Sequence, residues 1–139
     1  MQEQLSQMGI KTVMEILTFD QFLKKSRAGE LTFWIGGWIY DYPDAENIFQ
    51  LLYSQNAPGN NKTGFRSKEF DRLYLKLAEL DSGNGEVEAI VRRLQDIVLE
   101  EFPWIPLYYV RSTVMVKDQV KNFRRSSFIR NHLKYIRKL

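Results

Sequence analysis

Residues 31–44 read LTFWIGGWIYDYPD, and this stretch guides the interpretation of the chain on either side of it. From residue 31 to 38 it is apolar and aromatic apart from one Thr and two Gly, which is typical of a strand. Pro43 and Asp44 favour a turn, because Pro fixes its own φ and Asp hydrogen-bonds to nearby backbone. We therefore expect a strand over 31–38, a turn over 39–44 and a helical run over 45–53.

The residues before this stretch predict another strand and a helix. Residues 11–17 are rich in Val, Ile and Thr, which favours a strand. Thr18 with Gln21 three residues later has the spacing of a capping box, and Gly29 is typical of the position just past a helix end. The order strand, helix, strand predicts a β-α-β unit with parallel strands and a right-handed crossover.

Two amphipathic helices are predicted farther along the chain. Ser67 is a candidate N-cap, and the apolar residues after it follow the 3.6-residue helical period: Phe70, Leu73, Tyr74, Leu77 and Leu80. After a Gly-containing break at 81–85, the most regular segment again has one apolar face: Val87, Ile90, Val91, Leu94, Ile97 and Val98. This second helix cannot continue through Pro103, which lacks an amide donor.

The remaining segments predict shorter elements. Residues 2–8 are expected to form the last turns of a helix, and residues 54–64 a loop in which Asn60 and Asn61 are turn residues. Residues 107–110 and 113–116 are expected to be strands. The tail is expected to be irregular, with a short strand near 133–136.

The composition indicates a globular protein and limits its chemistry. The 139 residues are 44% hydrophobic and 14% aromatic, which is enough apolar material for the core of one domain. With no cysteine, the chain cannot form a disulfide or a thiolate metal site. The single histidine, His132, is too little for a histidine metal cluster, and we expect it to be an ordinary tail residue. We therefore expect no catalytic residue, no metal site, no cofactor and no enzyme activity.

Charge is unevenly distributed along the chain. Residues 117–139 contain eight of the 20 Lys and Arg but only one of the 17 Asp and Glu. The same tail contains Phe123, Phe128 and Tyr135, which could stack on bases. A nucleic-acid or anionic-surface contact is therefore an alternative function, but a solvated basic face is favoured and no nucleic-acid partner is expected.

Five blocks in order give a resemblance to a known family. They are the helix end and Gly-Ile-Lys run over 2–13, GWIYDYPD at 37–44, PGNN at 58–61, GFRSKEFD at 64–71 and PWIPLYY at 103–109. This pattern resembles the extracytoplasmic solute-binding proteins of the peptide/nickel ABC transporters, the oligopeptide- and dipeptide-binding type of family 5. The resemblance implies an α/β fold, one lobe of a type II periplasmic-binding-protein-like fold, with a β-α-β start followed by helices and C-terminal strands.

The resemblance covers only the C-terminal portion of such a protein. We therefore expect residues 1–139 to be a single partial domain, the C-terminal lobe, without the N-terminal lobe and the signal peptide. Residues 1–4 have neither the basic nor the apolar region of a secretory signal, in keeping with that expectation.

The resemblance also implies a binding site in the turn after residue 37. Asp41 is implied to bind the α-ammonium group of a peptide, and Trp38 to pack beside the ligand. Tyr40 and Tyr42 are implied to add aromatic wall. A carboxylate suits an ammonium group, because a charge-assisted hydrogen bond is stronger than a neutral one. Asp41 could instead be a turn former or a helix cap, although Asp44 suits capping better.

The function that the resemblance implies is non-catalytic binding of oligopeptides or dipeptides for uptake by an ABC transporter. The implied partners are short peptides, the transporter permease and the missing N-terminal lobe, in a periplasmic or extracytoplasmic, membrane-associated location. Besides the basic-tail binder, one further alternative is a fragment without independent function that self-associates as a homo-oligomer. A missing lobe would leave apolar surface and sheet edges exposed, which favours association.

Overall fold

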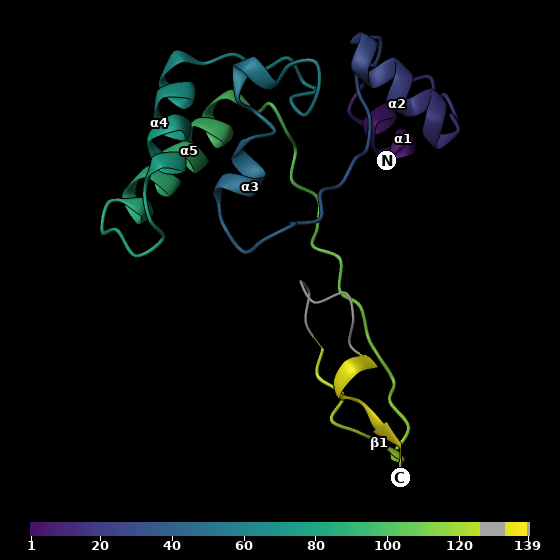
Figure 1. Cartoon of the computed structure of the whole chain (residues 1–139). Helices are drawn as coiled ribbons and strands as arrows, with labels where there is room; N and C mark the ends of the chain where they lie inside the picture. Colours follow the sequence, from purple (N-terminus) through teal and green to yellow (C-terminus); the bar gives the residue numbers. More distant parts are fainter. Residues whose placement is uncertain (126–132, 139) are drawn as a thin grey trace. The chain divides into compact units, whose positions relative to one another are not determined.

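The computed structural model describes residues 1–125 and 133–138, so the predictions about Phe128 and His132 lie outside the described residues. The chain divides into two compact units, Met1–Trp34 and Ile35–Leu139, here called unit 1 and unit 2. Unit 1 contains helices α1 (Gln2–Gln7) and α2 (Phe19–Ala28). Unit 2 contains helices α3 (Glu46–Phe49), α4 (Lys68–Glu79) and α5 (Val87–Glu101) and the short strands β1 (Val120–Lys121) and β2 (Arg137–Lys138) (Figure 1).

Unit 1 follows its local sequence signals closely where it is helical. Helix α1 (Gln2–Gln7) is followed by Gly9 with a φ of 80°, a left-handed conformation that glycine adopts without strain. Helix α2 (Phe19–Ala28) begins with the predicted capping box, in which Thr18 Oγ1 accepts from the Gln21 amide and Gln21 Oε1 accepts from the Thr18 amide. It ends at Gly29, as predicted, with a φ of 70°.

The predicted β-α-β unit is wrong for the described chain. Residues 11–17 and 31–38 lie before and after α2, as predicted, but neither segment forms a strand. A strand needs a neighbour for its backbone N–H and C=O groups, and β-branched residues favour strands mainly because they fit a half-buried pleated surface. Neither condition is met here, since Val13 is 93% exposed and Ile16 is 89% exposed. The prediction identified extended chain and not a sheet.

The hydrophobic core of unit 2 lies between α3 (Glu46–Phe49), α4 (Lys68–Glu79) and α5 (Val87–Glu101). The residues predicted for the apolar faces of α4 and α5 all lie in this core or pack against it, so both helices are confirmed. The helical run predicted over 45–53 is shorter than expected, because α3 has only four residues. The buried residues of the core are Phe49, Leu52, Phe70, Tyr74, Leu77, Ile90, Leu94 and Ile97.

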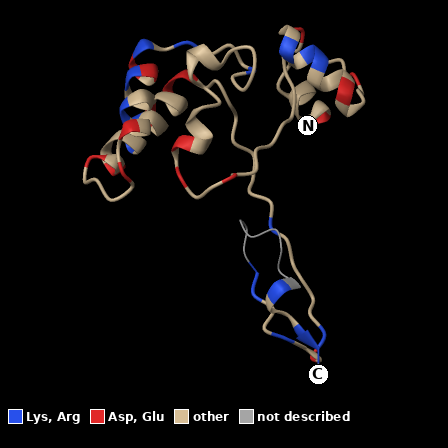
Figure 2. Cartoon of the chain, in the orientation of Figure 1, with Lys and Arg blue, Asp and Glu red and all other residues tan. Residues whose placement is uncertain are grey.

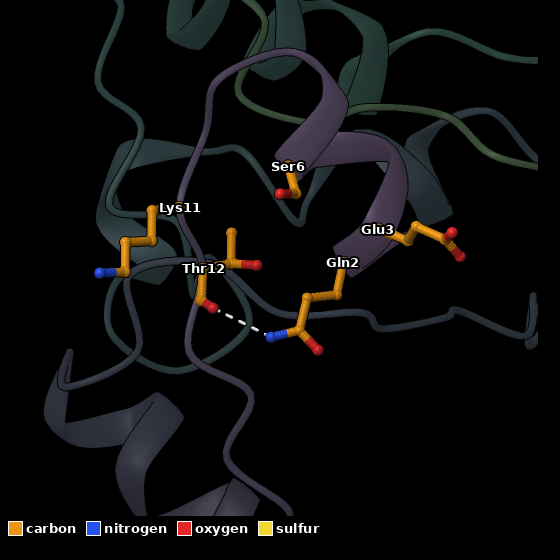
Figure 3. A pocket seen from close by; sticks show the side chains of 5 residues that line it. All are labelled: Gln2, Glu3, Ser6, Lys11 and Thr12. Atoms are coloured by element: carbon orange, nitrogen blue, oxygen red, sulfur yellow. Dashed lines mark hydrogen bonds between the residues drawn. The ribbon is translucent and has the colours of Figure 1, made fainter.

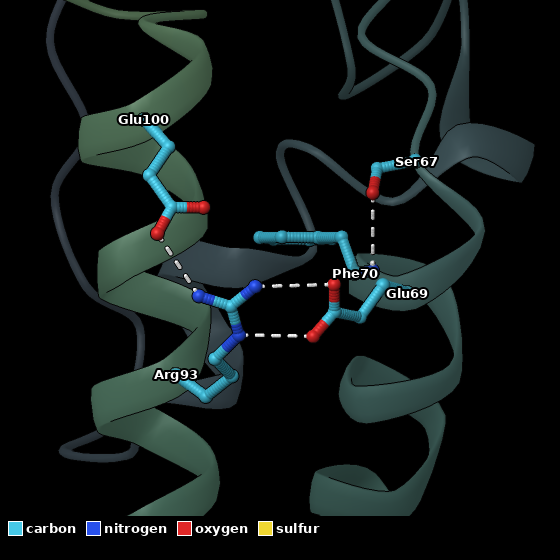
Figure 4. A network of polar contacts seen from close by, with 5 residues as sticks. All are labelled: Ser67, Glu69, Phe70, Arg93 and Glu100. Atoms are coloured by element: carbon cyan, nitrogen blue, oxygen red, sulfur yellow. Dashed lines mark hydrogen bonds and ion pairs between the residues drawn. The ribbon is translucent and has the colours of Figure 1, made fainter.

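The α4–α5 pair is also joined by polar contacts at the start of α4. Ser67 Oγ accepts a hydrogen bond from the Phe70 amide, which confirms the predicted N-cap. Across the helix pair, the Arg93 guanidinium of α5 donates two bonds to the Glu69 carboxylate of α4, and it donates a third bond to Glu100 within α5 (Figure 4). The bonds from Arg93 hold the pKa of Glu69 below its usual range. The contact is exposed, so it orients the pair more than it stabilises the fold.

The loop between α3 and α4 contains the 3-10 helix η1 (Ser54–Asn56) and is organised around Asn61. This side chain is fully buried, and its Nδ2 donates to the carbonyl oxygens of Leu52, Tyr53 and Phe65. Its Oδ1 accepts from the Thr63 hydroxyl at 3.0 Å. The predicted turn residue thus holds the loop together by saturating both ends of its amide.

The chain beyond α5 departs from the predicted strands. Residues 107–110 and 113–116 form no strand, and their side chains are exposed, with Tyr109 at 97% and Met115 at 95%. The strands of the described tail are β1 (Val120–Lys121) and β2 (Arg137–Lys138), which pair antiparallel. The strand expected near 133–136 is instead the 3-10 helix η2 (Leu133–Tyr135), directly before β2.

The described chain is therefore dominated by helices and has one two-stranded sheet. The finer prediction, an α/β lobe of a type II fold, remains a prediction.

Candidate functional site

The four predicted site residues lie in unit 2, in the chain that leads into α3. The indole of Trp38 is held in place: its Nε1 donates to Asn47 Oδ1 at 2.8 Å. Trp38 is nevertheless 38% exposed, so part of the ring remains open to solvent. A fixed and partly exposed indole can pack against a ligand at a low entropic cost, because its orientation is already determined.

Asp41 is held through its backbone and not through its side chain. Its amide donates to the same Asn47 Oδ1, at 3.4 Å. Within residues 1–125 and 133–138, its exposed carboxylate has no hydrogen-bond or ion-pair partner. An unpaired carboxylate on a fixed backbone can accept hydrogen bonds from a cation that arrives from solvent.

Asp44 makes the contact with the start of α3 that was the alternative interpretation for Asp41. Its Oδ1 accepts from the Glu46 amide at 2.9 Å, at the start of α3. This bond satisfies one of the free N–H groups of the helix end. The N-cap position of α3 is Ala45, so Asp44 lies one residue before it, but Asp44 and not Asp41 makes the side-chain contact with the start of the helix.

Tyr42 joins a second polar cluster, centred on Glu46. The hydroxyl groups of Tyr42 and Tyr74 both donate to the Glu46 carboxylate, the latter at 2.5 Å. The bond to Glu46 raises the pKa of Tyr42, with an opposing effect from the Asn47 amide. Burial, then the bond to Glu46, raises the pKa of Tyr74. Both phenols therefore stay neutral donors through the neutral pH range, and Tyr42 is fixed beside Asp41.

Tyr40 is the least constrained of the four predicted residues. It is 38% exposed, and burial followed by the nearby Tyr109 raises its pKa. Neither Asn47 nor Glu46 forms a hydrogen bond with it. The structure thus brings Trp38, Asp41 and Tyr42 together around the start of α3 and leaves Tyr40 outside this network.

Sequence reasoning missed Glu46 and Asn47, the two residues that organise the site. Both were treated only as part of a helical run. Asn47 is 1% exposed, which is unusual for its residue type and is not visible in the sequence. The one available signal was position, because polar side chains in the first turn of a helix can reach back to the preceding loop.

Other surface features do not involve the predicted residues. A shallow pocket in unit 1 is lined by Gln2, Glu3, Ser6, Lys11 and Thr12, and Gln2 donates to the Thr12 carbonyl across it (Figure 3). Among the described residues of the tail, Lys and Arg lie on and around β1 and β2 (Figure 2).

Within residues 1–125 and 133–138, no group of three His, Asp or Glu side chains is placed to hold a metal ion. The same part of the chain has no helix with both the length and the apolar character needed to cross a membrane.

Comparison with known proteins identifies relatives over most of the chain, although no family model matches it. Heme-binding protein A of Haemophilus influenzae is 30% identical over 124 residues, which is 88% of this chain and 22% of that protein. Di/tripeptide-binding protein 4 of Pseudomonas aeruginosa is 28% identical over 88% of this chain. An oligopeptide-binding protein of Bacillus subtilis is 22% identical over 82% of it. The chain spans less than a quarter of the length of these relatives.

Proposed function

Because this chain is related to the peptide- and heme-binding solute-binding proteins, as the sequence resemblance predicted, we propose that it is the ligand-binding part of such a protein. Its ligand is a short peptide, it performs no reaction, and it delivers the peptide to the permease of an ABC transporter. It works outside the cytoplasmic membrane, in the periplasmic or extracytoplasmic space. The relatives support binding as the activity, since their names state what they bind.

In this proposal, the Asp41 carboxylate accepts hydrogen bonds from the α-ammonium group of the peptide. Trp38 packs beside the first peptide unit, while Tyr40 and Tyr42 add aromatic wall. The observation that carries the proposal is the unpaired, exposed carboxylate of Asp41, whose backbone amide shares the Asn47 acceptor with the Trp38 indole. An exposed carboxylate without a partner can form charge-assisted hydrogen bonds with an incoming cationic group.

The carboxylate end of the peptide needs a partner from another part of a larger protein. Residues 31–42 contain no Lys or Arg. Solute-binding proteins that close around a ligand by hinge motion bury it between two lobes. The second lobe would supply the missing contacts, so this chain alone should bind in the millimolar range, about 4 kcal/mol of binding free energy.

The ammonium anchor is tested with dialanine and with N-acetyl-dialanine, which has the same backbone but no ammonium group. Binding is followed by the chemical shift of the Trp38 indole N–H in a titration of the 139-residue chain, and Asp41→Asn is the variant. Dialanine should shift the indole signal, and both acetylation and the variant should weaken binding by about tenfold, the value of one charge-assisted hydrogen bond. Equal binding of the acetylated peptide would refute the anchor, and a preference for hemin would point to the heme-binding relatives.

A second candidate function, self-association, is favoured by the exposed segment after α5. Tyr108, Tyr109, Val110 and Met115 are each more than 75% exposed in an extended, unpaired backbone. Extended apolar chain with free N–H and C=O groups is a template for pairing with a second copy. Sedimentation over a hundredfold dilution tests this candidate: a mass that falls to that of the monomer supports it, and a constant monomer mass contradicts it.

A further inference from the structure

One amide oxygen holds two of the proposed site residues at once. Asn47 Oδ1 accepts from Trp38 Nε1 at 2.8 Å and from the Asp41 amide at 3.4 Å. An amide oxygen has two lone pairs, so both are in use. The two N–H donors also determine which end of the amide is oxygen, because a nitrogen at that place would face two donors.

We infer that Asn47 is the positioning residue of the proposed site: its amide oxygen sets the placement of the Trp38 indole relative to the Asp41 backbone. The inference rests on the proposed function, because it assigns to Asn47 the geometry that a peptide would meet. Asn47 itself is 1% exposed and is not assigned a contact with the ligand.

The unused end of the Asn47 amide supports this assignment. Within the described residues, Nδ2 is buried and donates no hydrogen bond of ordinary geometry, although the Asn47 amide does lower the pKa of Tyr42. Buried polar atoms are nearly always paired, so a lone unpaired donor needs a reason. A residue chosen only for packing would avoid this cost, since a leucine of similar size carries no polar atoms. The acceptor at Oδ1 is the feature that a leucine could not supply.

A role in capping α3 does not explain Asn47. The Glu46 amide at the start of α3 is already bonded to Asp44 Oδ1. The Asn47 side chain instead points back to the loop before the helix, nine residues earlier at Trp38 and six residues earlier at Asp41. Its two bonds close the 38–47 segment into a defined turn.

The test uses the ¹⁵N-labelled 139-residue chain, in which the hydrogen exchange of the Trp38 indole N–H reports the bond directly. Trp38→Phe assigns the signal, and the indoles of Trp34 and Trp104 are internal references. Asn47→Leu removes the acceptor, whereas Asn47→Asp keeps an acceptor at this place and replaces the Nδ2 donor with a second, charged carboxylate oxygen. Ser67→Ala is the matched control, because it weakens α4 at its cap without touching the turn.

Asn47→Leu should speed the exchange of the Trp38 indole by about tenfold, as expected for one lost hydrogen bond, and weaken dialanine binding by a similar factor. Asn47→Asp should keep the slow exchange, and Ser67→Ala should change neither readout. Unchanged exchange in Asn47→Leu would overturn the inference. So would a lost indole bond with unchanged peptide affinity. If the unmodified chain does not bind dialanine, the proposed function fails, and the exchange comparison still decides whether Asn47 positions Trp38.

Discussion

Unit 2 contains two buried asparagines that use opposite ends of the same functional group. Asn61 donates through Nδ2 to three carbonyls and accepts through Oδ1 from Thr63, so both ends are satisfied. Asn47 accepts twice through Oδ1 and leaves Nδ2 without a hydrogen bond of ordinary geometry among the described residues. Two asparagines that are equally buried therefore have different roles. Asn61 closes a loop of the fold, whereas Asn47 holds the residues that are proposed to contact a ligand.

We expect the largest change in unfolding free energy when each asparagine is replaced with aspartate. Asn61→Asp places carboxylate oxygens against three carbonyl oxygens and should cost about 3 kcal/mol of unfolding free energy, the upper end for a buried unsatisfied group. Asn47→Asp keeps both accepted bonds but buries a carboxylate, so it should cost less than Asn61→Asp, about 2 kcal/mol. Urea denaturation of the two variants measures the difference. Equal losses would mean that the two amides are not used in opposite ways.

The next prediction compares the effects on stability of two carboxylates in the turn before α3, those of Asp41 and Asp44. Asp44→Ala removes the acceptor for the Glu46 amide and should cost about 1 kcal/mol, as for other helix caps. Asp41→Ala removes an exposed carboxylate and should change stability by less than about 0.5 kcal/mol. The same denaturation experiment applies. A larger loss for Asp41→Ala than for Asp44→Ala would assign Asp41 to the fold and not to a ligand.

The smallest effect is confined to alkaline pH and concerns the Glu46 cluster. The pKa of Tyr74 is raised in the folded chain, so its stabilising contribution is complete below the unfolded value of about 10 and is lost as the pH rises above it. Tyr74→Phe should therefore show a shallower loss of unfolding free energy between about pH 10 and 11 than the unmodified chain. The lysine residues titrate in this pH range in both proteins, so their contribution cancels when the two slopes are compared. Identical slopes would argue against the raised pKa of Tyr74 and so against its two causes, burial and the bond to Glu46.

The helices of unit 2 could be predicted from sequence because their signals are local. The apolar period over α4 and α5, the Ser67 cap and the stop before Pro103 all depend on neighbours within a few residues. The strands could not be predicted in the same way. Residues 11–17 have strand composition, but a strand forms only if another segment lies beside it, and composition does not say whether one does.

The candidate site shows the same division between local and long-range information. The contact of Asp44 with the start of α3 could be anticipated, because an Asp just before a helical run is a local signal. The roles of Glu46 and Asn47 were not, since each depends on contacts made after folding: Glu46 meets Tyr74 from 28 residues away, and Asn47 meets Trp38 from nine. The resemblance to peptide-binding proteins indicates the candidate site residues. The structure shows which side chains form hydrogen bonds with them.

We propose that the turn held by Asn47 binds a peptide and that the loop held by Asn61 does not. A titration of the ¹⁵N-labelled chain with dialanine, with amide and indole shifts followed along the whole sequence, tests this proposal. We expect the shifts to concentrate at Trp38, Asp41 and Tyr42, while the amides of residues 61–65 remain unchanged. Shifts centred on the Asn61 loop or on the basic tail, or no shifts at all, would contradict it.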